Sequence, residues 1–314
     1  MVKSRLKLFA GTSHPTLARE IGEYLGLPIS EVEIFKFKND NTFVKIHESV
    51  RQCNVFVLQT SCPPVNDGLM EVLLLIDALK RASARTVTVL MPYYAYCRSD
   101  KKDQPRISIA ASLVAKLLES AGADRVVTMD LHAEQIQGFF TVPVDQLKAM
   151  PVIGQYFREQ GLDDVVAVAP DAGSAKKTGS FARRLRVPLA VMDKRRQGND
   201  DSAKILHLIG DVRDKTAVLF DDEISTGRSL VGAAHALKDN GAKRILAAVT
   251  HGVLCGDAPQ LLQNSPIEEI VVTNTLPHNE NQQFEKLKVL SIAHIFGEAI
   301  SRISKGESIT ALFS

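Results

Sequence analysis

The regular alternation of short apolar runs with amphipathic stretches constrains the fold of this chain more than any other feature. Apolar runs of four to six residues, which predict buried strands, lie at Val55–Gln59, Thr86–Met91, Arg125–Met129, Val165–Ala169, Leu189–Met192, Ala217–Phe220 and Ile270–Thr273, and a further strand is expected within Met1–Ala10. The stretches that predict helices are Pro15–Leu25, Leu69–Ala82, Ile109–Ala121, Ser174–Leu185, Leu230–Asn240 and Ile292–Ile303. Strands that alternate with helices of about 10–15 residues are typical of α/β domains built on parallel sheets.

The length of 314 residues predicts two domains, because domains hold roughly 100–200 residues each. Pro143 and Pro151 interrupt the pattern, so we place a boundary there, with domains at 1–147 and 148–314. The alternation resumes after this boundary, and the last predicted helix is free to pack back on the first domain. Gly122, Gly161 and Gly241 stand at joints before predicted strands, where a left-handed helix cap is expected.

Composition excludes two classes of partner. The 38 basic residues are nearly balanced by 36 acidic ones, and a net charge of +2 does not fit the uniformly basic surface that coats nucleic acid. No apolar run approaches the roughly 18–20 residues of a membrane-spanning helix. The four cysteines form no C-x-x-C pair, so reduced thiols and a cytoplasmic location are expected.

Acidic residues follow three of the predicted strands. Asp130 comes after Arg125–Met129, Asp171 after Val165–Ala169, and the pair Asp221-Asp222 after Ala217–Phe220. In parallel α/β sheets, ligands bind beyond the carboxyl ends of the strands. A single aspartate at such a place is best interpreted as a cap for the next helix. Because the pattern recurs at three strand ends, we favour a ligand site.

The most specific local motif is Val218–Ser229, which reads VLFDDEISTGRS. An apolar strand leads through two acids into a turn of small residues, and a helix is predicted from Leu230. The hydroxyl and backbone N–H groups of this turn suit a phosphate, which the N-terminus of the helix also attracts. The acids suit the hydroxyls of a sugar, so the motif predicts a ribose 5-phosphate site and resembles that of type I phosphoribosyltransferases.

Asp130–Phe140, DLHAEQIQGFF, closely resembles the signature of the ribose-phosphate diphosphokinase (phosphoribosyl pyrophosphate synthetase) family. Other segments match that family in the same register along the chain, at Glu48–Arg51, Pro64–Asp67, Leu73–Ala84, Gly122–Asp130, Pro170–Gly173, Asp193–Arg196 and Gly306–Ser308. The resemblance implies an α/β protein of two tandem phosphoribosyltransferase-like domains. It also implies transfer of the β,γ-diphosphoryl group of ATP to the anomeric hydroxyl of ribose 5-phosphate, with Mg²⁺ as cofactor.

The resemblance assigns roles to individual residues. His132 and Asp171 fall where the family holds magnesium, and His132 also belongs with the nucleotide phosphates. Lys194 and Arg196 match the catalytic cations of a mobile loop. The remaining ATP-binding positions are Phe37, Asn39, Asn41, Arg98 and Ser99, and those for ribose 5-phosphate are Asp221, Asp222, Ser225, Thr226, Gly227, Arg228 and Ser229. The family's adenine site is shared between subunits of a hexamer built from dimers, which implies a homo-oligomer.

Several positions depart from the family pattern. Asn39 and Asn41 replace carboxylates near the adenine, and an amide both donates and accepts where an ionised carboxylate only accepts. We therefore expect a looser or shifted preference among nucleoside triphosphates. Ser99 replaces a Gln, Ser225 removes a charge beside the sugar phosphate, and Arg228 replaces a Gly, so Arg228 either points to solvent or pairs with the phosphate.

Two other functions fit part of the sequence. A non-catalytic regulatory subunit of the same family would have lost the loop cations or the phosphate turn, which this chain keeps. A type I phosphoribosyltransferase fits the motif Val218–Ser229 but not the segment Asp130–Phe140. Regulation by phosphate or ADP stays open, because Ser112 stands where the family commonly has a Lys, while Ser308 and Thr310 keep the terminal pattern.

Overall fold

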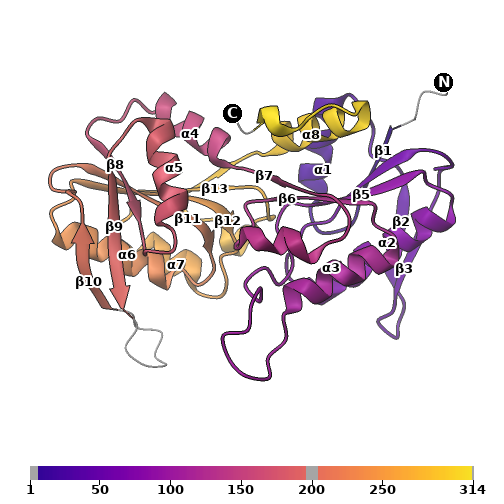
Figure 1. The fold of residues 1–314 in the computed structure, drawn as a ribbon, viewed down its shortest axis with the longest axis horizontal. Helices are drawn as coiled ribbons and strands as arrows, with labels where there is room; N and C mark the ends of the chain where they lie inside the picture. Colours follow the sequence, from indigo (N-terminus) through magenta and orange to yellow (C-terminus); the bar gives the residue numbers. More distant parts are fainter. Residues whose placement is uncertain (1–5, 196–203, 313–314) are drawn as a thin grey trace. The chain divides into compact units, whose positions relative to one another are not determined.

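The computed structural model describes residues 6–195 and 204–312 and divides the chain into two compact units. Unit 1 contains Met1–Lys148, Thr275–Pro277 and Ser291–Ser314, and unit 2 contains Ala149–Asn274 and His278–Leu290. The chain therefore returns to unit 1 for its last helix, α8, drawn in yellow in Figure 1 beside α1 of the same unit. The Tyr24 hydroxyl of α1 donates to Glu298 of α8 at 3.1 Å.

Unit 1 is built on a parallel sheet of order β1-β4-β5-β6-β7, with an antiparallel hairpin, β2–β3, as a second small sheet. Its strands are β1 Leu6–Ala10, β2 Val32–Lys36, β3 Thr42–Ile46, β4 Asn54–Leu58, β5 Thr86–Met91, β6 Arg125–Met129 and β7 Val144–Leu147. Its helices are α1 Pro15–Leu25, α2 Val65–Arg81, α3 Ala110–Ala121 and α8 Ala293–Lys305, with 3₁₀ turns at Glu134–Phe139 and Thr310–Leu312.

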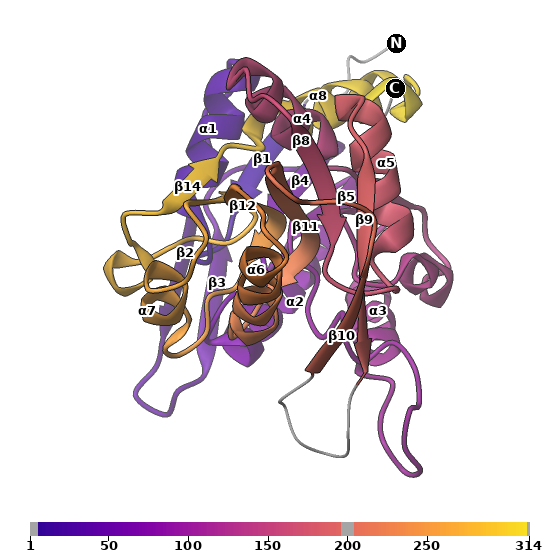
Figure 2. The ribbon, with the colours of Figure 1, turned by 90° about the vertical axis from the view of Figure 1, so that its left-hand side faces the viewer.

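Unit 2 is built on a sheet of order β10-β9-β8-β11-β12-β13-β14, in which β10 alone runs antiparallel to its neighbour. Figure 2 shows β9 and β10 side by side at one edge of this sheet. The strands are β8 Val165–Ala169, β9 Leu189–Arg195, β10 Lys204–Ile209, β11 Thr216–Ile224, β12 Arg244–Gly252, β13 Glu269–Thr273 and β14 Leu287–Leu290. The helices are α4 Met150–Glu159, α5 Ala175–Leu185, α6 Arg228–Asp239 and α7 Ala258–Gln263, with a 3₁₀ turn at Glu280–Gln282.

Buried helix faces cover both cores. In α2 the fully buried residues are Val72, Leu75, Ile76 and Leu79, spaced as one face of a helix requires. They pack in one cluster with β5, whose residues after Thr86 are all buried, as in a parallel sheet covered on both faces. Burial of each such side chain stabilises the fold by about 1.5–3 kcal/mol, which fixes the strand ends that carry the polar residues.

The expected α/β architecture with mainly parallel sheets is confirmed, and Gly122, Gly161 and Gly241 have positive φ as predicted. Three local expectations are corrected. The strand expected to end at Phe220 continues to Ile224, so Asp221 and Asp222 lie inside β11 rather than after it. The helix expected from Leu230 begins at Arg228. The segment around Pro143 and Pro151 holds β7 and the start of α4 rather than a break in the pattern.

Candidate active site

Asp221 and Asp222 point to opposite faces of the unit 2 sheet, because side chains alternate along a strand. Phe220 stacks on Phe181 of α5, with ring centroids 4.4 Å apart, so the even-numbered residues of this part of β11 face α5. Leu219 packs in the cluster that contains the buried residues of α6. Asp222 therefore lies on the α5 side and Asp221 on the α6 side, which lets the pair reach ligand groups on two sides of the strand.

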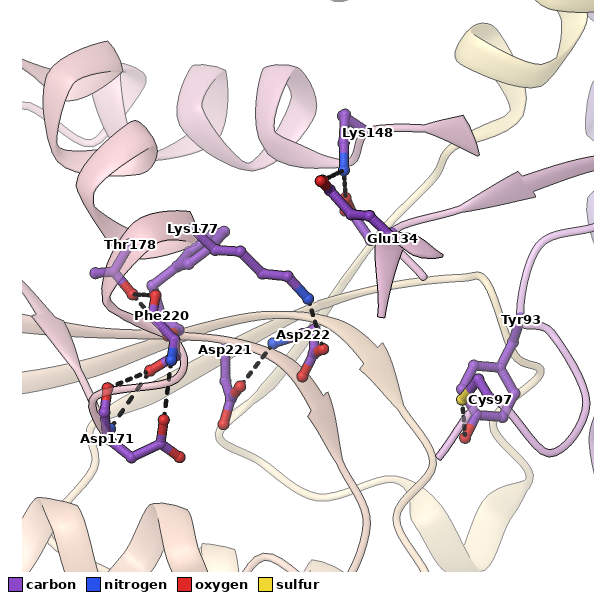
Figure 3. A network of polar contacts seen from close by, with 12 residues as sticks. Tyr93, Cys97, Glu134, Lys148, Asp171, Lys177, Thr178, Phe220, Asp221 and Asp222 are labelled. Carbon is purple, nitrogen blue, oxygen red and sulfur yellow. Dashed lines mark hydrogen bonds and ion pairs between the residues drawn. The ribbon is translucent and has the colours of Figure 1, made fainter. Parts of the chain in front are cut away.

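Two further charged residues accompany this pair. The Lys177 ammonium extends from α5 and lies 2.8 Å from Oδ2 of Asp222, as Figure 3 shows. Asp171, exposed after β8, accepts a hydrogen bond at Oδ1 from the Ser174 amide at 2.9 Å. This bond closes the turn before α5, whose N-cap residue is Ser174, and it occupies only one of the two Asp171 carboxylate oxygens.

The acid cluster has an electrostatic consequence at Asp221. Burial of its carboxyl raises the pKa of Asp221 well above the ordinary value, and the neighbouring charges of Asp222 and Asp171 raise it further. The Asp222 amide donates to Asp221 Oδ1 at 2.8 Å, which works against this rise without cancelling it. A site that resists ionisation in this way favours a cation or the donated hydroxyls of a sugar, because either would stabilise the charged form.

The turn after β11 leads into α6 through Gly227, which is buried and adopts φ 74°. Glycine allows this left-handed conformation without a steric penalty, and it has no side chain with which to cap the helix. The N-terminus of an α-helix attracts anions, because its first N–H groups point away from the helix, so the start of α6 is a suitable place for a phosphate. Arg228 is exposed and is the first residue of α6.

The three hydroxyl-bearing residues expected to bind the phosphate differ in exposure. Ser225 is half-buried, with its Oγ 3.7 Å from Sγ of Cys255, whereas Thr226 and Ser229 are exposed. The sequence-predicted ribose 5-phosphate residues thus lie on one continuous segment of unit 2. Lys177, a charged residue beside Asp222, is the one that the sequence did not assign.

The expected nucleotide residues His132, Arg98 and Ser99 all belong to unit 1. His132 is exposed in the loop after β6, and Arg98 is exposed in the segment between β5 and α3. Ser99 is half-buried, and its carbonyl accepts from the Ala111 amide at 3.2 Å. Its backbone therefore ties the segment to the start of α3. Asp130, the acid at the end of β6, lies 3.6 Å from the Lys148 ammonium, which also contacts Glu134 at 3.0 Å (Figure 3).

The aromatic run before Arg98 divides between core and surface. Tyr94 is almost fully buried and its hydroxyl donates to the Ala111 carbonyl at 2.9 Å. The Tyr93 hydroxyl and the Cys97 thiol lie 3.7 Å apart (Figure 3). Tyr96 is 42% exposed and donates to Asn66 at 2.5 Å. Packing thus accounts for Tyr94, whereas Tyr96 is a surface residue.

Phe37, Asn39 and Asn41 form the loop of the β2–β3 hairpin. Phe37 is 49% exposed, and its ring meets those of Phe35 and Phe43 at centroid distances of 5.0 and 5.7 Å. Asp40, between the two asparagines, adopts φ 66°. Aspartate tolerates this left-handed region better than most residues, which suits it to the tight loop.

Lys194 and Arg196, which we expect to be the catalytic cations, are described only in part. The backbone of Lys194 pairs with Ile205 where β9 runs beside β10, and Arg196 lies outside the described residues. Within residues 6–195 and 204–312, no group of three His, Cys, Asp or Glu side chains is arranged to hold a metal ion. In the same ranges, no helix is long and apolar enough to cross a membrane.

Comparisons with known proteins agree along nearly all of the chain. Residues 6–122 match the N-terminal domain of ribose phosphate pyrophosphokinase, and residues 200–314 match the phosphoribosyl synthetase-associated domain. A ribose-phosphate pyrophosphokinase of Caldanaerobacter subterraneus subsp. tengcongensis is 50% identical over 310 residues, which is 98% of each chain. One of Clostridium perfringens is 49% identical, covering 98% of this chain and 97% of its own.

A solved structure also matches nearly the whole chain. The phosphoribosylpyrophosphate synthetase of Mycobacterium smegmatis superposes with a TM-score of 0.92 at 44% identity, covering 96% of this chain and 100% of that one.

Proposed function

The chain belongs to the ribose-phosphate pyrophosphokinase family, and we propose that its two units supply different substrates to one reaction. The reaction transfers the β,γ-diphosphoryl group of ATP to the anomeric hydroxyl of ribose 5-phosphate, giving phosphoribosyl pyrophosphate and AMP. We propose that unit 1 provides the ATP contacts. This unit comprises the expected domain 1–147 together with the last helix of the chain. Unit 2, within 148–314, binds ribose 5-phosphate.

One observation carries this assignment: β11, which holds the two acids near its end, is joined to the N-terminus of α6 by a turn of three residues. The 5-phosphate would accept hydrogen bonds from the N–H groups at the start of α6 and from the hydroxyls of Ser225, Thr226 and Ser229. The sugar hydroxyls would donate to Asp221 and Asp222, which in their ionised form accept hydrogen bonds and donate none. Exposed Arg228 is not required by this arrangement and is assigned to solvent.

The chemistry needs alignment and charge neutralisation more than covalent catalysis. Arg98, Ser99 and His132 would hold the ATP phosphates and adenine from unit 1, and Lys194 and Arg196 would neutralise charge that develops on the bridging oxygen. The raised pKa of Asp221 and the exposed Asp171 mark a negative environment that suits a hard divalent cation. We assign Asp171 and His132 to Mg²⁺, which would offset charge on the transferred phosphates.

We also propose that the adenine site is shared between subunits and that the protein is cytoplasmic. Phe37, half exposed on a hairpin loop, would stack on the adenine bound by a neighbouring subunit, so the active form is a homo-oligomer built from dimers, with a hexamer as the expected state. The four cysteines form no disulfide, which supports a reducing compartment.

Release of AMP separates this function from the alternatives. The protein would be mixed with Mg²⁺, ATP and ribose 5-phosphate, and AMP followed by chromatography. We expect AMP only when both substrates are present, and far less from Lys194→Ala. A regulatory subunit would form none, and a type I phosphoribosyltransferase would not release AMP from these substrates. If wild-type protein forms no more AMP than Lys194→Ala does, the proposal is wrong.

A further inference from the structure

We propose that Lys177 is a positioning residue for ribose 5-phosphate, which it serves by holding the Asp222 carboxylate in its binding orientation. The inference rests on the proposed function, because it assigns Asp222 to the sugar. Lys177 lies on α5, 45 residues before Asp222, and neither the strand-end acids nor the phosphate turn include it.

The ion pair is short and partly shielded from solvent. Lys177 Nζ lies 2.8 Å from Asp222 Oδ2, and the side chains are 33% and 13% exposed, respectively. Ion pairs on open surfaces contribute little because both side chains are mobile and solvated. Here the carboxylate is the less exposed partner, so the ammonium restricts its rotation and offsets its charge where water does so incompletely.

The backbone beneath Lys177 is fixed to the strand that carries Asp222. Thr178, the next residue on α5, is fully buried and its hydroxyl donates to the Phe220 carbonyl of β11 at 3.4 Å. One turn further on, Phe181 stacks on Phe220. These contacts set the distance between α5 and β11, and Figure 3 shows the Lys177 side chain extending from α5 to Asp222.

Side chains alternate between the two faces of β11, so Lys177 acts on only one of the two adjacent acids. Asp221 faces α6 and Asp222 faces α5, so a cation on α5 pairs with Asp222 and not with Asp221. Without that cation, two adjacent carboxylates and Asp171 would repel one another, and Asp222 would turn toward water. The predicted loss is therefore in affinity for the sugar phosphate and not in the chemical step.

Three variants test this inference. Lys177→Met removes the charge and keeps the length of the side chain, Lys177→Arg keeps the charge, and Lys176→Met is the matched control on an exposed neighbour. Steady-state assays of AMP formation would give kcat and separate KM values for ribose 5-phosphate and ATP. Denaturant unfolding of each variant would show that the fold is retained, and Lys177→Gln replaces Lys177→Met if the methionine variant does not fold.

We expect Lys177→Met to raise the KM for ribose 5-phosphate about tenfold while the KM for ATP stays within about twofold. Lys177→Arg should recover most of the loss, and Lys176→Met should behave as wild type. The inference is overturned if Lys177→Met leaves the KM for ribose 5-phosphate within about twofold of wild type, or if the arginine and methionine variants lose affinity equally. Absence of AMP from wild-type protein would instead refute the proposed function itself.

Discussion

The Phe37 amide donates to the Asn41 carbonyl across 2.9 Å, and this bond closes the loop of the β2–β3 hairpin. The Asn41 amide in turn donates to Oδ1 of Asn39 at 3.3 Å. An aspartate at position 39 could accept the same bond, so the loop geometry does not depend on the amide. The departure of Asn39 and Asn41 from the family's carboxylates therefore changes the hydrogen-bonding and charge that the loop presents to a base, and leaves its backbone intact.

This geometry makes base specificity testable by a double substitution. Asn39→Asp with Asn41→Glu should raise the ratio of kcat/KM for ATP over that for GTP by about tenfold or more, because a carboxylate accepts strongly from the amino group of adenine and repels a carbonyl. Formation of phosphoribosyl pyrophosphate from each triphosphate is the measurement. A wild-type protein that already uses ATP and no other triphosphate would contradict the expectation.

A shared adenine site predicts complementation between two defective variants. Phe37→Ala lacks the stacking ring, and Lys194→Ala lacks the loop cation, so each alone should lose most activity. Mixed oligomers should regain part of it, because a site can then combine Phe37 from one subunit with Lys194 from the other. The variants would be mixed under conditions that allow subunit exchange. Activity equal to the sum of the separate variants would show that the two residues serve the same subunit.

Gly227, at the N-cap of α6, and Gly232, within α6, form a matched pair for substitution by alanine. A Cβ on Gly227 would lie 3.2 Å from Cγ of Leu262, at φ 74°, whereas a Cβ on Gly232 meets nothing within 4 Å. Gly227→Ala should therefore cost about 1–2 kcal/mol of unfolding free energy and raise the KM for ribose 5-phosphate. Gly232→Ala should stabilise the helix by about 0.5–1 kcal/mol. Equal effects of the two substitutions would rule out a special backbone at Gly227.

The raised pKa of Asp221 predicts a pH-dependent effect on stability. The folded protein holds the Asp221 proton more tightly than the unfolded chain, so ionisation costs stability as the pH rises through the raised pKa. Asp221→Asn, neutral throughout, should raise Tm of the ligand-free protein more at pH about 8 than at pH about 5. Differential scanning calorimetry measures this difference.

Asp211 provides a control of opposite sign. Its bond to Lys215 lowers the pKa of Asp211, so its ionised form is the favoured one in the fold. Asp211→Asn should lower Tm slightly where Asp221→Asn raises it. A gain in Tm from Asp221→Asn that does not change between the two pH values would show that the Asp221 carboxyl titrates normally.

Much of the fold could be predicted from local patterns. The α1, β5, β6 and β8 boundaries agree with the expected ranges, because each is a clear apolar or amphipathic segment with a distinct end. The α4 helix was missed because Pro151 was interpreted as a break, although proline is well tolerated in the first turn, where it stands. β12, which contains Ala247 and Ala248, offers no clear strand signal, since alanine favours helices.

The candidate site was predictable where its residues are close in sequence. Asp221 to Ser229 form one segment, and the order of acids, turn and helix indicates its ligand directly. Lys177 could not be found in this way, because its partner is 45 residues away and only the packing of α5 on β11 brings them together. The hairpin that presents Phe37 was also missed as a pair of strands, since β2 and β3 are partly exposed and interrupted by charged residues.

The fate of the β-phosphate tests the central claim most directly. ATP labelled at the β-phosphorus would be incubated with the protein, Mg²⁺ and ribose 5-phosphate, and the products separated by chromatography. Diphosphoryl transfer predicts that the label appears in phosphoribosyl pyrophosphate while unlabelled AMP forms in equal amount. Label that remains in ADP would show transfer of the γ-phosphoryl group alone, and label released as free pyrophosphate would show hydrolysis; either result would contradict the account.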